Sequence, residues 1–390
     1  MPTVQALASV SHLECSNCRQ WYDAYKPQTF ASCCNKPLLV KYTSEGIPRS
    51  VLKNRPANMW RYREMMPVLE DNNIVSLGEG MTPILHLQKT GEKYGLPQLL
   101  MKDESRNPTG SFKARGISAA ISKAKEFGMD TCIIPTAGNA GGAMAAYCAV
   151  AGMRAIIVMP AHTPKIFMDE CELYGAELIL VDGLINDCAR KVAEIKQHID
   201  CFDVSTLKEP YRIEGKKTMG YEIAEQLNWE LPEVILYPTG GGTGLIGMWK
   251  AFHEMIALGW IENRLPKMIA VQAENCQPLM QTWLGNQPNA KTYMGKPSVA
   301  NGLVVPNPFG EDLILQVLKQ SGGLPITISD EAMTRGMKEL AREEGLLVAP
   351  EGGALLQGVL NLIEKEVISR HEKIVLLNTG SGYKYLENIL

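Results

Sequence analysis

The sequence predicts an α/β protein built on parallel β-sheets. Short apolar segments alternate with longer helical segments from residue 98 to residue 198. Such alternation favours a parallel sheet with right-handed crossovers, whose ligands bind at the carboxyl ends of the strands. The same logic returns after residue 233, where glycine-rich loops follow apolar segments. With 390 residues, the chain is long enough for two domains and a small appendage.

Each expected element rests on a local run of apolar or helix-favouring residues. In the first series we expect strands at 98–102, 131–135, 155–159 and 177–181, and helices at 117–127, 143–151, 164–174 and 185–198. In the second series we expect a strand at 233–237, a helix through Met255, and strands at 268–273, 325–328, 347–348 and 373–377. Residues 45–75 are interpreted as an arm across a domain surface, without chemistry of its own.

The composition argues against several classes of partner. Hydrophobic residues make up 45% of the chain and the net charge is -3, so nothing suggests nucleic acid or an anionic membrane as a partner. No apolar stretch approaches the length of a membrane span, and residues 1–14 lack the pattern of a signal peptide. Six cysteines are scattered singly, which is typical of reduced core residues, so we expect a cytoplasmic location. They are Cys132, Cys148, Cys171, Cys188, Cys201 and Cys276.

The other four cysteines form a candidate zinc site in an N-terminal extension. Cys15 and Cys18 are a C-x2-C pair, whereas Cys33 and Cys34 are adjacent. A structural zinc ion needs four ligands that converge as a tetrahedron. Because neighbouring side chains diverge in extended chain, we expect only Cys34 of the second pair to join Cys15 and Cys18, with His12 as a candidate fourth ligand. The alternative is a ribbon that holds no metal.

Lys113 is the candidate catalytic side chain. It follows a turn at residues 107–110 and stands beside Phe112, just before a helical segment. In that position a lysine loses hydration and lies near the positive end of the helix dipole, and both effects push its amine toward the neutral form. A neutral amine is a nucleophile that forms Schiff bases with carbonyl compounds. The alternative is an ordinary surface lysine beside a loop.

A glycine-rich loop at residues 238–247, PTGGGTGLIG, is a candidate phosphate cradle. Glycines let backbone amides turn inward, and the helix that follows adds its N-terminal donors. The loop also satisfies G-x-G-x-x-G, which would suggest a nicotinamide cofactor in an NAD-dependent oxidoreductase. That site needs an acidic residue about 20 positions on, whereas the next strand ends near Glu274. Pyridoxal phosphate needs less room and requires a lysine, which Lys113 supplies.

Several loops resemble those of the fold type II pyridoxal-phosphate enzymes, specifically the threonine synthases. They are ESRNPTGSFKARG around Lys113, TAGNAGG around Asn139, GGGTG at residues 240–244 and NTGSG at residues 378–382. The segments SLGEGMTP, YRIEGKKT and PEGG point the same way, so the resemblance runs from about Ser76 to the C-terminus.

The resemblance implies two interleaved, doubly wound parallel-sheet domains of the tryptophan synthase beta-like kind. Residues 46–115 and 206–390 would form a large cofactor-binding domain, and residues 116–205 a small α/β domain. Residues 1–45 would be a zinc-ribbon-like extension. The family resemblance also suggests a homodimer.

The resemblance implies a role for each residue of the site. Lys113, beside Phe112, would hold pyridoxal phosphate covalently. Asn139 would hydrogen-bond the ring hydroxyl, and Thr379 would face the pyridine nitrogen. The phosphate of the cofactor would be bound by Gly240, Gly241, Gly242, Thr243 and Gly244, and that of the substrate by Arg212 and Ser205. For Arg212, the alternative is an ion pair with Glu209 or Glu214.

The reaction that the resemblance implies converts O-phospho-L-homoserine and water into L-threonine and phosphate, by gamma-elimination and beta-addition of water. Two residues depart from the common family pattern: many threonine synthases have aspartate at the position of Ala114 and a hydroxyl residue at that of Ala137. A cysteate synthase-like beta-replacement on phosphoserine and a threonine or serine deaminase are therefore alternatives. A catalytically silent ligand sensor belongs to a different class. Arg212 and Lys216 should line the pocket only if the substrate carries a phosphate.

Overall fold

The computed structural model describes residues 10–43, 47–286, 293 and 295–389. The chain divides into two compact units. Unit 1 comprises Met1–Met81, Lys113–Thr218 and His253–Trp260, and unit 2 comprises Thr82–Phe112, Met219–Phe252 and Ile261–Leu390. In the described ranges, no helix combines the length and the apolar character that crossing a membrane would require.

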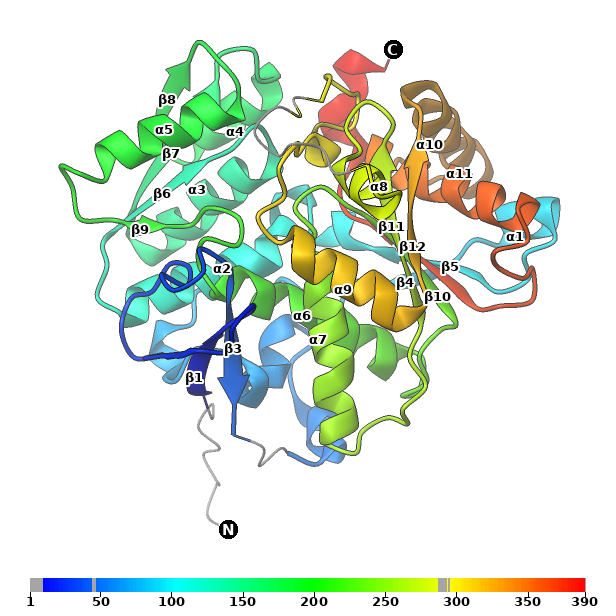
Figure 1. The fold of residues 1–390 in the computed structure, drawn as a ribbon, viewed down its shortest axis with the longest axis horizontal. Helices are drawn as coiled ribbons and strands as arrows, with labels where there is room; N and C mark the ends of the chain where they lie inside the picture. The colour runs from blue at the N-terminus through cyan, green and yellow to red at the C-terminus, as the bar shows by residue number, and fades with distance from the viewer. Residues whose placement is uncertain (1–9, 44–46, 287–292, 294, 390) are drawn as a thin grey trace. The chain divides into compact units, whose positions relative to one another are not determined.

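Unit 2 contains a six-stranded sheet in the order β12-β11-β10-β13-β5-β4 (Figure 1). All neighbouring strands are parallel except the edge strand β4, which runs antiparallel to β5. The strands are β4 (Ile84–His86), β5 (Leu99–Asp103), β10 (Val234–Pro238), β11 (Lys267–Ala273), β12 (Leu324–Ile328) and β13 (Ile374–Asn378). The central strands β10 and β13 are buried along their whole length, as expected of a parallel sheet covered on both faces.

The helices that accompany this sheet are α1 (Gln88–Tyr94), α8 (Pro278–Trp283), α9 (Glu311–Ser321), α10 (Asp330–Glu344) and α11 (Pro350–Glu364). Two further helices, α6 (Tyr211–Gln226) and α7 (Thr243–Ala257), continue from one unit into the other along the chain. Leucine, isoleucine and valine side chains from the strands and from α10 and α11 form one buried core. Burial of this apolar surface is the main stabilising contribution in the unit.

Unit 1 contains two sheets (Figure 1). A four-stranded parallel sheet has the order β8-β7-β6-β9, and a three-stranded antiparallel sheet has the order β2-β1-β3. The parallel strands are β6 (Thr131–Pro135), β7 (Arg154–Pro160), β8 (Glu177–Val181) and β9 (Phe202–Asp203), and the helices are α2 (Lys113–Glu126), α3 (Asn139–Ala151), α4 (Lys165–Leu173) and α5 (Ile185–Ile195). The antiparallel strands are β1 (Val10–Cys15), β2 (Trp21–Tyr22) and β3 (Leu38–Tyr42). The predicted α/β class with parallel sheets is confirmed.

The two units are bounded differently from the expected domains. Residues 47–81, expected in the larger domain, lie in unit 1, where the buried carboxylate of Glu79 ties them to its helices. Glu79 accepts hydrogen bonds from Trp60 Nε1 at 2.9 Å, from Ser118 Oγ of α2 at 2.6 Å and from Tyr147 Oη of α3 at 2.6 Å. A buried carboxylate is tolerated only when donors satisfy it in this way.

Two local expectations also need correction. The strand expected at 347–348 is absent: Val348 makes only an isolated bridge with Ser381. The stretch is too short for a strand, because α10 is capped by Gly345 at φ +68° and α11 begins at Pro350. The helix expected from residue 117 begins four residues earlier, at Lys113 itself.

Each parallel sheet has one point at which the strand order reverses. In unit 2 the order reverses between β10 and β13, and in unit 1 it reverses between β6 and β9. Crossover connections leave such a sheet in opposite directions at this point, which opens a crevice at the carboxyl ends of the two strands. A ligand site is therefore expected at these two reversal points.

Candidate active site

Three predicted loops meet at the reversal point of unit 2. Residues of β5 pair with β13, and β13 pairs with β10, so the loops at their carboxyl ends are neighbours. The amide of Phe112 donates to the carbonyl oxygen of Thr379 at 3.1 Å, and the amide of Ser381 donates to Gly110 O at 2.9 Å. The turn that precedes Lys113 is therefore fastened to the loop that carries Thr379.

The glycine-rich loop connects β10 to the N-terminus of α7, as predicted. Gly242 has φ +70°, a conformation that favours glycine. A Cβ atom on Gly240 would lie 2.3 Å from Gly302 O, so a side chain does not fit there either. Gly241 completes the loop and Thr243 is the first residue of the 15-residue helix α7. The amides in the first turn of a helix have no partner within the helix and point away from its N-terminus. The space before the helix therefore favours a bound anion.

Tyr237, at the end of β10, links the cradle to the loop that precedes Lys113. Its ring meets that of Phe112 edge to face at a centroid distance of 6.1 Å. Its hydroxyl accepts a hydrogen bond from the amide of Gly244, and burial raises the pKa of Tyr237, so the hydroxyl stays neutral. A Cβ on Gly244 would lie 2.2 Å from this oxygen. Sequence reasoning did not identify Tyr237, although a tyrosine directly before a cradle was a usable signal.

Lys113 follows Phe112 in the chain and is the first residue of α2. This confirms the expected position of the lysine, beside an aromatic ring at a helix N-terminus. The peptide bond between the two residues is also one of the places where the chain passes from unit 2 to unit 1. Lys113 is half-buried rather than a fully exposed surface lysine.

Two predicted residues lie at the reversal point of unit 1. Asn139 is the first residue of α3, which follows β6, and the buried Ser205 follows β9. Both the amide and the hydroxyl of Ser205 donate to Asp203 Oδ1, which fixes the loop after β9. The same loop is bound by Arg212 from the start of α6, because Arg212 Nη1 donates to Val204 O at 2.7 Å.

Arg212 and Lys216 form a buried positive cluster with Lys113. The exposed fractions of Arg212 and Lys216 are 1% and 0%, and these two residues lie one helical turn apart on α6. Burial lowers the pKa of Lys216 well below its usual value, and the charges of Arg212 and Lys113 lower it further. Burial likewise lowers the pKa of Arg212.

Two buried carboxylates act on this cluster: Asp203 acts on Arg212, and Glu209 acts on both Arg212 and Lys216. Burial raises the pKa of Glu209 to about 7, although Arg212 and Lys216 act in the opposite direction. The carboxylate accepts hydrogen bonds from the amides of Tyr211 and Arg212 and so caps the start of α6. Burial disfavours the charged forms of Arg212 and Lys216, so a bound anion would stabilise their protonated forms.

The alternative of an ion pair between Arg212 and a nearby glutamate is not supported. Glu214 pairs with Lys217 Nζ at 2.6 Å and accepts from Tyr42 Oη at 2.6 Å. Among the described residues Arg212 makes no ion pair with Glu209 or Glu214. The buried Nε atom of Arg212 has no hydrogen-bond partner in the same part of the chain. This N–H group is thus available to a ligand with acceptor oxygens.

Two glycines set the distance between Lys113 and the cations of α6. A Cβ atom on Gly215 of α6 would lie 2.0 Å from Arg115 O of α2. A Cβ on Gly116 of α2 would lie 2.9 Å from both Arg212 O and Lys216 Cε. Only glycine at these positions lets the backbones of α2 and α6 approach so closely. The Lys216 side chain consequently lies against the first turns of the helix that begins with Lys113.

We expect Gly215→Ala to destabilise the protein more than Gly116→Ala, because its overlap is with rigid backbone. Overpacking of this kind costs about 1–3 kcal/mol. In a domain of about 150–250 residues that lowers the midpoint of thermal unfolding by roughly 2–4 °C per kcal/mol. Thermal unfolding followed by circular dichroism measures the effect. Equal midpoints for wild type and Gly215→Ala would contradict the close crossing.

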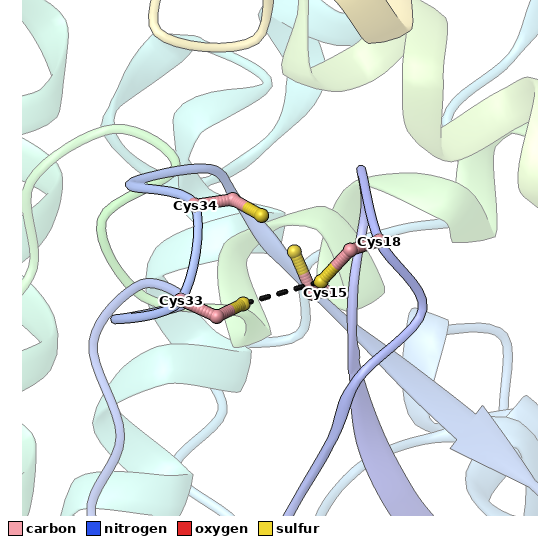
Figure 2. Close-up of side chains that lie close together, drawn as sticks. All are labelled: Cys15, Cys18, Cys33 and Cys34. Carbon is pink, nitrogen blue, oxygen red and sulfur yellow. Dashed lines mark hydrogen bonds between the residues drawn. The ribbon is translucent and has the colours of Figure 1, made fainter.

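The N-terminal cysteines form a second group in unit 1 (Figure 2). The sulfur atoms of Cys15, Cys18, Cys33 and Cys34 all lie within 4.8 Å of one another. The expectation that only one of the adjacent pair faces the others is wrong, because both belong to a tight turn rather than to extended chain. His12 is not in the group: its ring stacks on Trp21 at 4.0 Å.

The donors described above fit pyridoxal phosphate. The loop at residues 240–244 offers backbone amides to a phosphate where side chains would not fit. Lys113 offers an amine for the aldehyde carbon, and it is attached to Phe112, which is held beside the cradle through Tyr237. A nicotinamide dinucleotide site needs an acidic residue about 20 positions on, at the end of the next strand, whereas here that strand, β11, ends only at Ala273.

Comparisons with known proteins agree with this fit. A family model described as pyridoxal-phosphate dependent enzyme matches residues 75–380. A threonine synthase of Methanocaldococcus jannaschii is 31% identical over 95% of this chain and 92% of its own length. A threonine synthase of Methanosarcina acetivorans is 32% identical, with 97% of this chain and 93% of its own length covered.

Solved structures resemble the fold at lower identity. Maize serine racemase has a TM-score of 0.68 and 21% identity, with 86% of this chain and 99% of that chain covered. The processed form of threonine deaminase isoform 2 from Solanum lycopersicum has a TM-score of 0.67 and 19% identity, with 90% and 98% covered. From these matches and the site geometry, the chain belongs to the pyridoxal-phosphate-dependent enzyme family, in the group of the threonine synthases.

Proposed function

We propose that this protein is a threonine synthase that converts O-phospho-L-homoserine and water into L-threonine and phosphate. The observation that carries the proposal is the buried cluster of Arg212 and Lys216 beside Lys113. Burial disfavours the charged forms of both side chains, so a ligand that brings its own negative charge would stabilise them. A substrate phosphate supplies that charge close to the lysine on which the chemistry depends. The threonine synthase relatives support the same reading.

Lys113 has two proposed roles. Its Nζ atom would hold pyridoxal phosphate covalently, and the same amine, when free, would take the proton from the alpha carbon of the substrate. Lys216 lies close enough to Lys113 for their charges to act on each other. The neutral form of Lys113 is the form that accepts a proton. Pyridoxal phosphate, when bound, supplies an electron sink for the charge left on carbon.

The other residues orient the cofactor. We assign its phosphate to the cradle at residues 240–244, at the start of α7, where the amide of Gly244 donates to Tyr237 Oη. Asn139, at the start of α3, would hydrogen-bond the ring hydroxyl, and the buried Thr379 would face the pyridine nitrogen. A hydroxyl group at that nitrogen does not enforce protonation of the ring, as a carboxylate would. The electron demand of the ring is therefore moderated.

Arg212, Lys216 and Ser205 are proposed to bind the substrate phosphate. A guanidinium group binds two phosphate oxygens at once, and an ammonium group adds a second charge. These contacts hold the bond between the gamma carbon and the phosphate oxygen in place while it breaks. The electron pair of that bond leaves with the phosphate, after proton loss at the alpha and beta carbons. Water then gives its hydroxyl group to the beta carbon, and protons return to the gamma and alpha carbons. The balance is one water consumed and one phosphate released per threonine formed.

The alternative functions differ in substrate. Ala114 and Ala137 stand where many relatives have polar residues, so a beta-replacement on phosphoserine is a competing reaction, and so is deamination of threonine. The cluster of Arg212 and Lys216 favours a phosphorylated substrate over an unphosphorylated one. Loss of a hydroxyl donor at Ala137 leaves the phosphate more dependent on these two cations.

The experiment supplies purified protein and pyridoxal phosphate with three separate substrates: O-phosphohomoserine, O-phosphoserine with sulfite, and L-threonine. We expect equal amounts of threonine and phosphate from the first, and at most trace turnover of the others. Cysteate as the main product would select the beta-replacement instead. Formation of 2-oxobutyrate from threonine, with no turnover of phosphohomoserine, would select a deaminase.

We further propose that the protein acts in the cytoplasm as a homodimer. Its described cysteines carry no disulfide, which suits a reducing compartment. The homodimer rests on the family resemblance alone. Light scattering on the purified protein measures the mass directly, and a monomeric mass would overturn the dimer.

A further inference from the structure

We propose that Cys15, Cys18, Cys33 and Cys34 bind one structural zinc ion. The sulfur atoms lie within 4.8 Å of one another, and those of Cys18 and Cys33 are 3.3 Å apart. Tetrahedral zinc with four thiolates places its sulfur atoms about 3.8 Å apart. The four thiols are thus close to the required arrangement before any ion is added. Figure 2 shows that all four side chains point toward a common centre.

The first pair lies in a turn of the kind that presents thiolates to a metal. The amides of Asn17 and Cys18 donate hydrogen bonds to Cys15 Sγ, and the amide of Gln20 donates to Cys18 Sγ. Arg19 adopts φ +66°, which turns the chain sharply after the second cysteine. Such amide donors compensate negative charge on sulfur and orient the first ligands of a metal.

The second pair lies in a turn closed by a bridge between Ala31 and Lys36. The amide of Asn35 donates to Ala31 O at 2.9 Å, and Asn35 itself has φ +50°. This compact turn, unlike extended chain, directs both adjacent thiols to the same side (Figure 2). Cys33 is therefore the fourth candidate ligand, a role for which the sequence had suggested His12.

The second turn is fastened to its surroundings by side chains as well. The amide of Cys33 donates to Tyr22 Oη at 3.0 Å, and Asn17 Nδ2 lies 3.5 Å from Cys34 Sγ in donor geometry. The contact of Asn17 joins the two turns directly. Neighbouring groups position the four thiols so that they converge, although Cys18 and Cys33 are exposed. This arrangement suits a bound metal better than four cysteines with independent roles.

The site lies where an ion would strengthen contacts with the catalytic helices. Leu13 of β1 and Val40 of β3 belong to the same buried core as Ile117 of α2. Tyr42, the last residue of β3, donates to Glu214 of α6 and lies with its ring 4.0 Å from Lys217 Nζ. The strands themselves are short, so the ion would supply a cross-link at the end of the sheet that the small core does not provide.

The test measures metal in the full-length protein. Cells are grown in medium that contains zinc, and the metal content of the desalted protein is measured by plasma mass spectrometry. We expect one zinc per chain in the wild type and near-complete loss in both Cys33→Ser and Cys34→Ser. The matched control Cys201→Ser, a partly buried cysteine outside the group, should retain full zinc.

Three results would overturn the proposal. One is wild-type protein without zinc, including protein that holds iron in its place. Another is full zinc retention in Cys33→Ser. The third is a thiol titration of the unreduced, denatured protein that finds two thiols fewer than the ten cysteines of the sequence, because a disulfide would then occupy the site.

A second measurement avoids dependence on folding of the variants. Zinc is stripped from wild-type holoenzyme with a chelator and Co²⁺ is added as the probe. Difference spectra against the cobalt-free holoenzyme should show thiolate-to-cobalt charge transfer and tetrahedral d–d bands that saturate at one cobalt per chain. Chelation should lower the midpoint of thermal unfolding, on the order of 5 °C, and zinc should restore it. An unchanged spectrum on adding cobalt contradicts the site, whatever the substrate of the enzyme is.

Discussion

Replacing Lys113 with alanine is expected to abolish threonine formation. The amine is proposed to hold the cofactor and to move the substrate's alpha proton, so the substitution removes both contributions. Proton transfer by a positioned side chain alone contributes about 10²–10⁴-fold, and we expect kcat to fall by at least about 10³-fold. Lys113 is half-buried at the first position of α2, and alanine is the best helix former. The fold should therefore survive.

The measurement combines product formation with absorbance. Wild-type protein with pyridoxal phosphate should show the visible absorbance of the lysine-bound cofactor, and Lys113→Ala should not. The matched control is Lys125→Ala on the same helix, where the exposed lysine donates to Asn72 O. This control should keep both absorbance and activity. Wild-type turnover in Lys113→Ala would contradict the assignment.

Removing the buried cations of α6 is expected to have the second largest effect. Lys216→Met keeps the length of the side chain but deletes its charge, and Arg212→Gln deletes the guanidinium fork. A hydrogen bond to a charged group is worth roughly 1.5–3 kcal/mol, so kcat/KM for O-phosphohomoserine should fall by about 10–10²-fold in each variant. Most of the loss should appear in KM if the phosphate is bound equally in the ground state and the transition state.

Inhibition by inorganic anions separates this role from a structural one. Phosphate and sulfate should inhibit the wild type competitively and should inhibit Lys216→Met much less. Lys208→Met, the same change in the segment before α6, should leave inhibition intact. Equal inhibition of all three proteins would contradict a phosphate site at Lys216.

The lowered pKa of Lys216 also predicts a pH dependence. A bound anion stabilises the protonated lysine and so raises its pKa, which means that anion binding takes up a proton. Affinity should therefore fall as pH rises through the range between the pKa values of the empty and the occupied site. Sulfate is the appropriate probe because its own charge stays constant. Lys216→Met should show a flatter profile.

The loops of the candidate site could be predicted from the sequence. They place glycine, asparagine and lysine together where a strand meets a helix, and few roles other than ligand binding require those residues there. The strand at 131–135 was predicted at the right place, whereas α7 begins at Thr243, inside the stretch 238–247 that it was expected to follow. The position of Lys113 was also right, although its helix begins earlier than expected. The contribution of Gly215 was not predicted, because the need for glycine there arises from a backbone atom of another helix.

Other features depended on tertiary structure in the same way. Cys33 was excluded on the expectation of an extended chain, whereas the bridge between Ala31 and Lys36 bends this segment into a turn. Residues 347–348 are apolar, but the helices on either side leave no room for a strand. The role of Tyr237 depends on the contact of its ring with that of Phe112 and on the hydrogen bond that the amide of Gly244 donates to its hydroxyl. None of these contacts has a periodic signature in the sequence.

The most direct measurement of the central claim is turnover of O-phosphohomoserine in water enriched in oxygen-18. The proposed reaction predicts threonine that carries the heavy oxygen at its beta hydroxyl and phosphate that carries none, because the bond that breaks joins the gamma carbon to oxygen. Hydrolysis at phosphorus would give homoserine and labelled phosphate instead. That pattern, or the absence of labelled threonine, would contradict the proposed reaction.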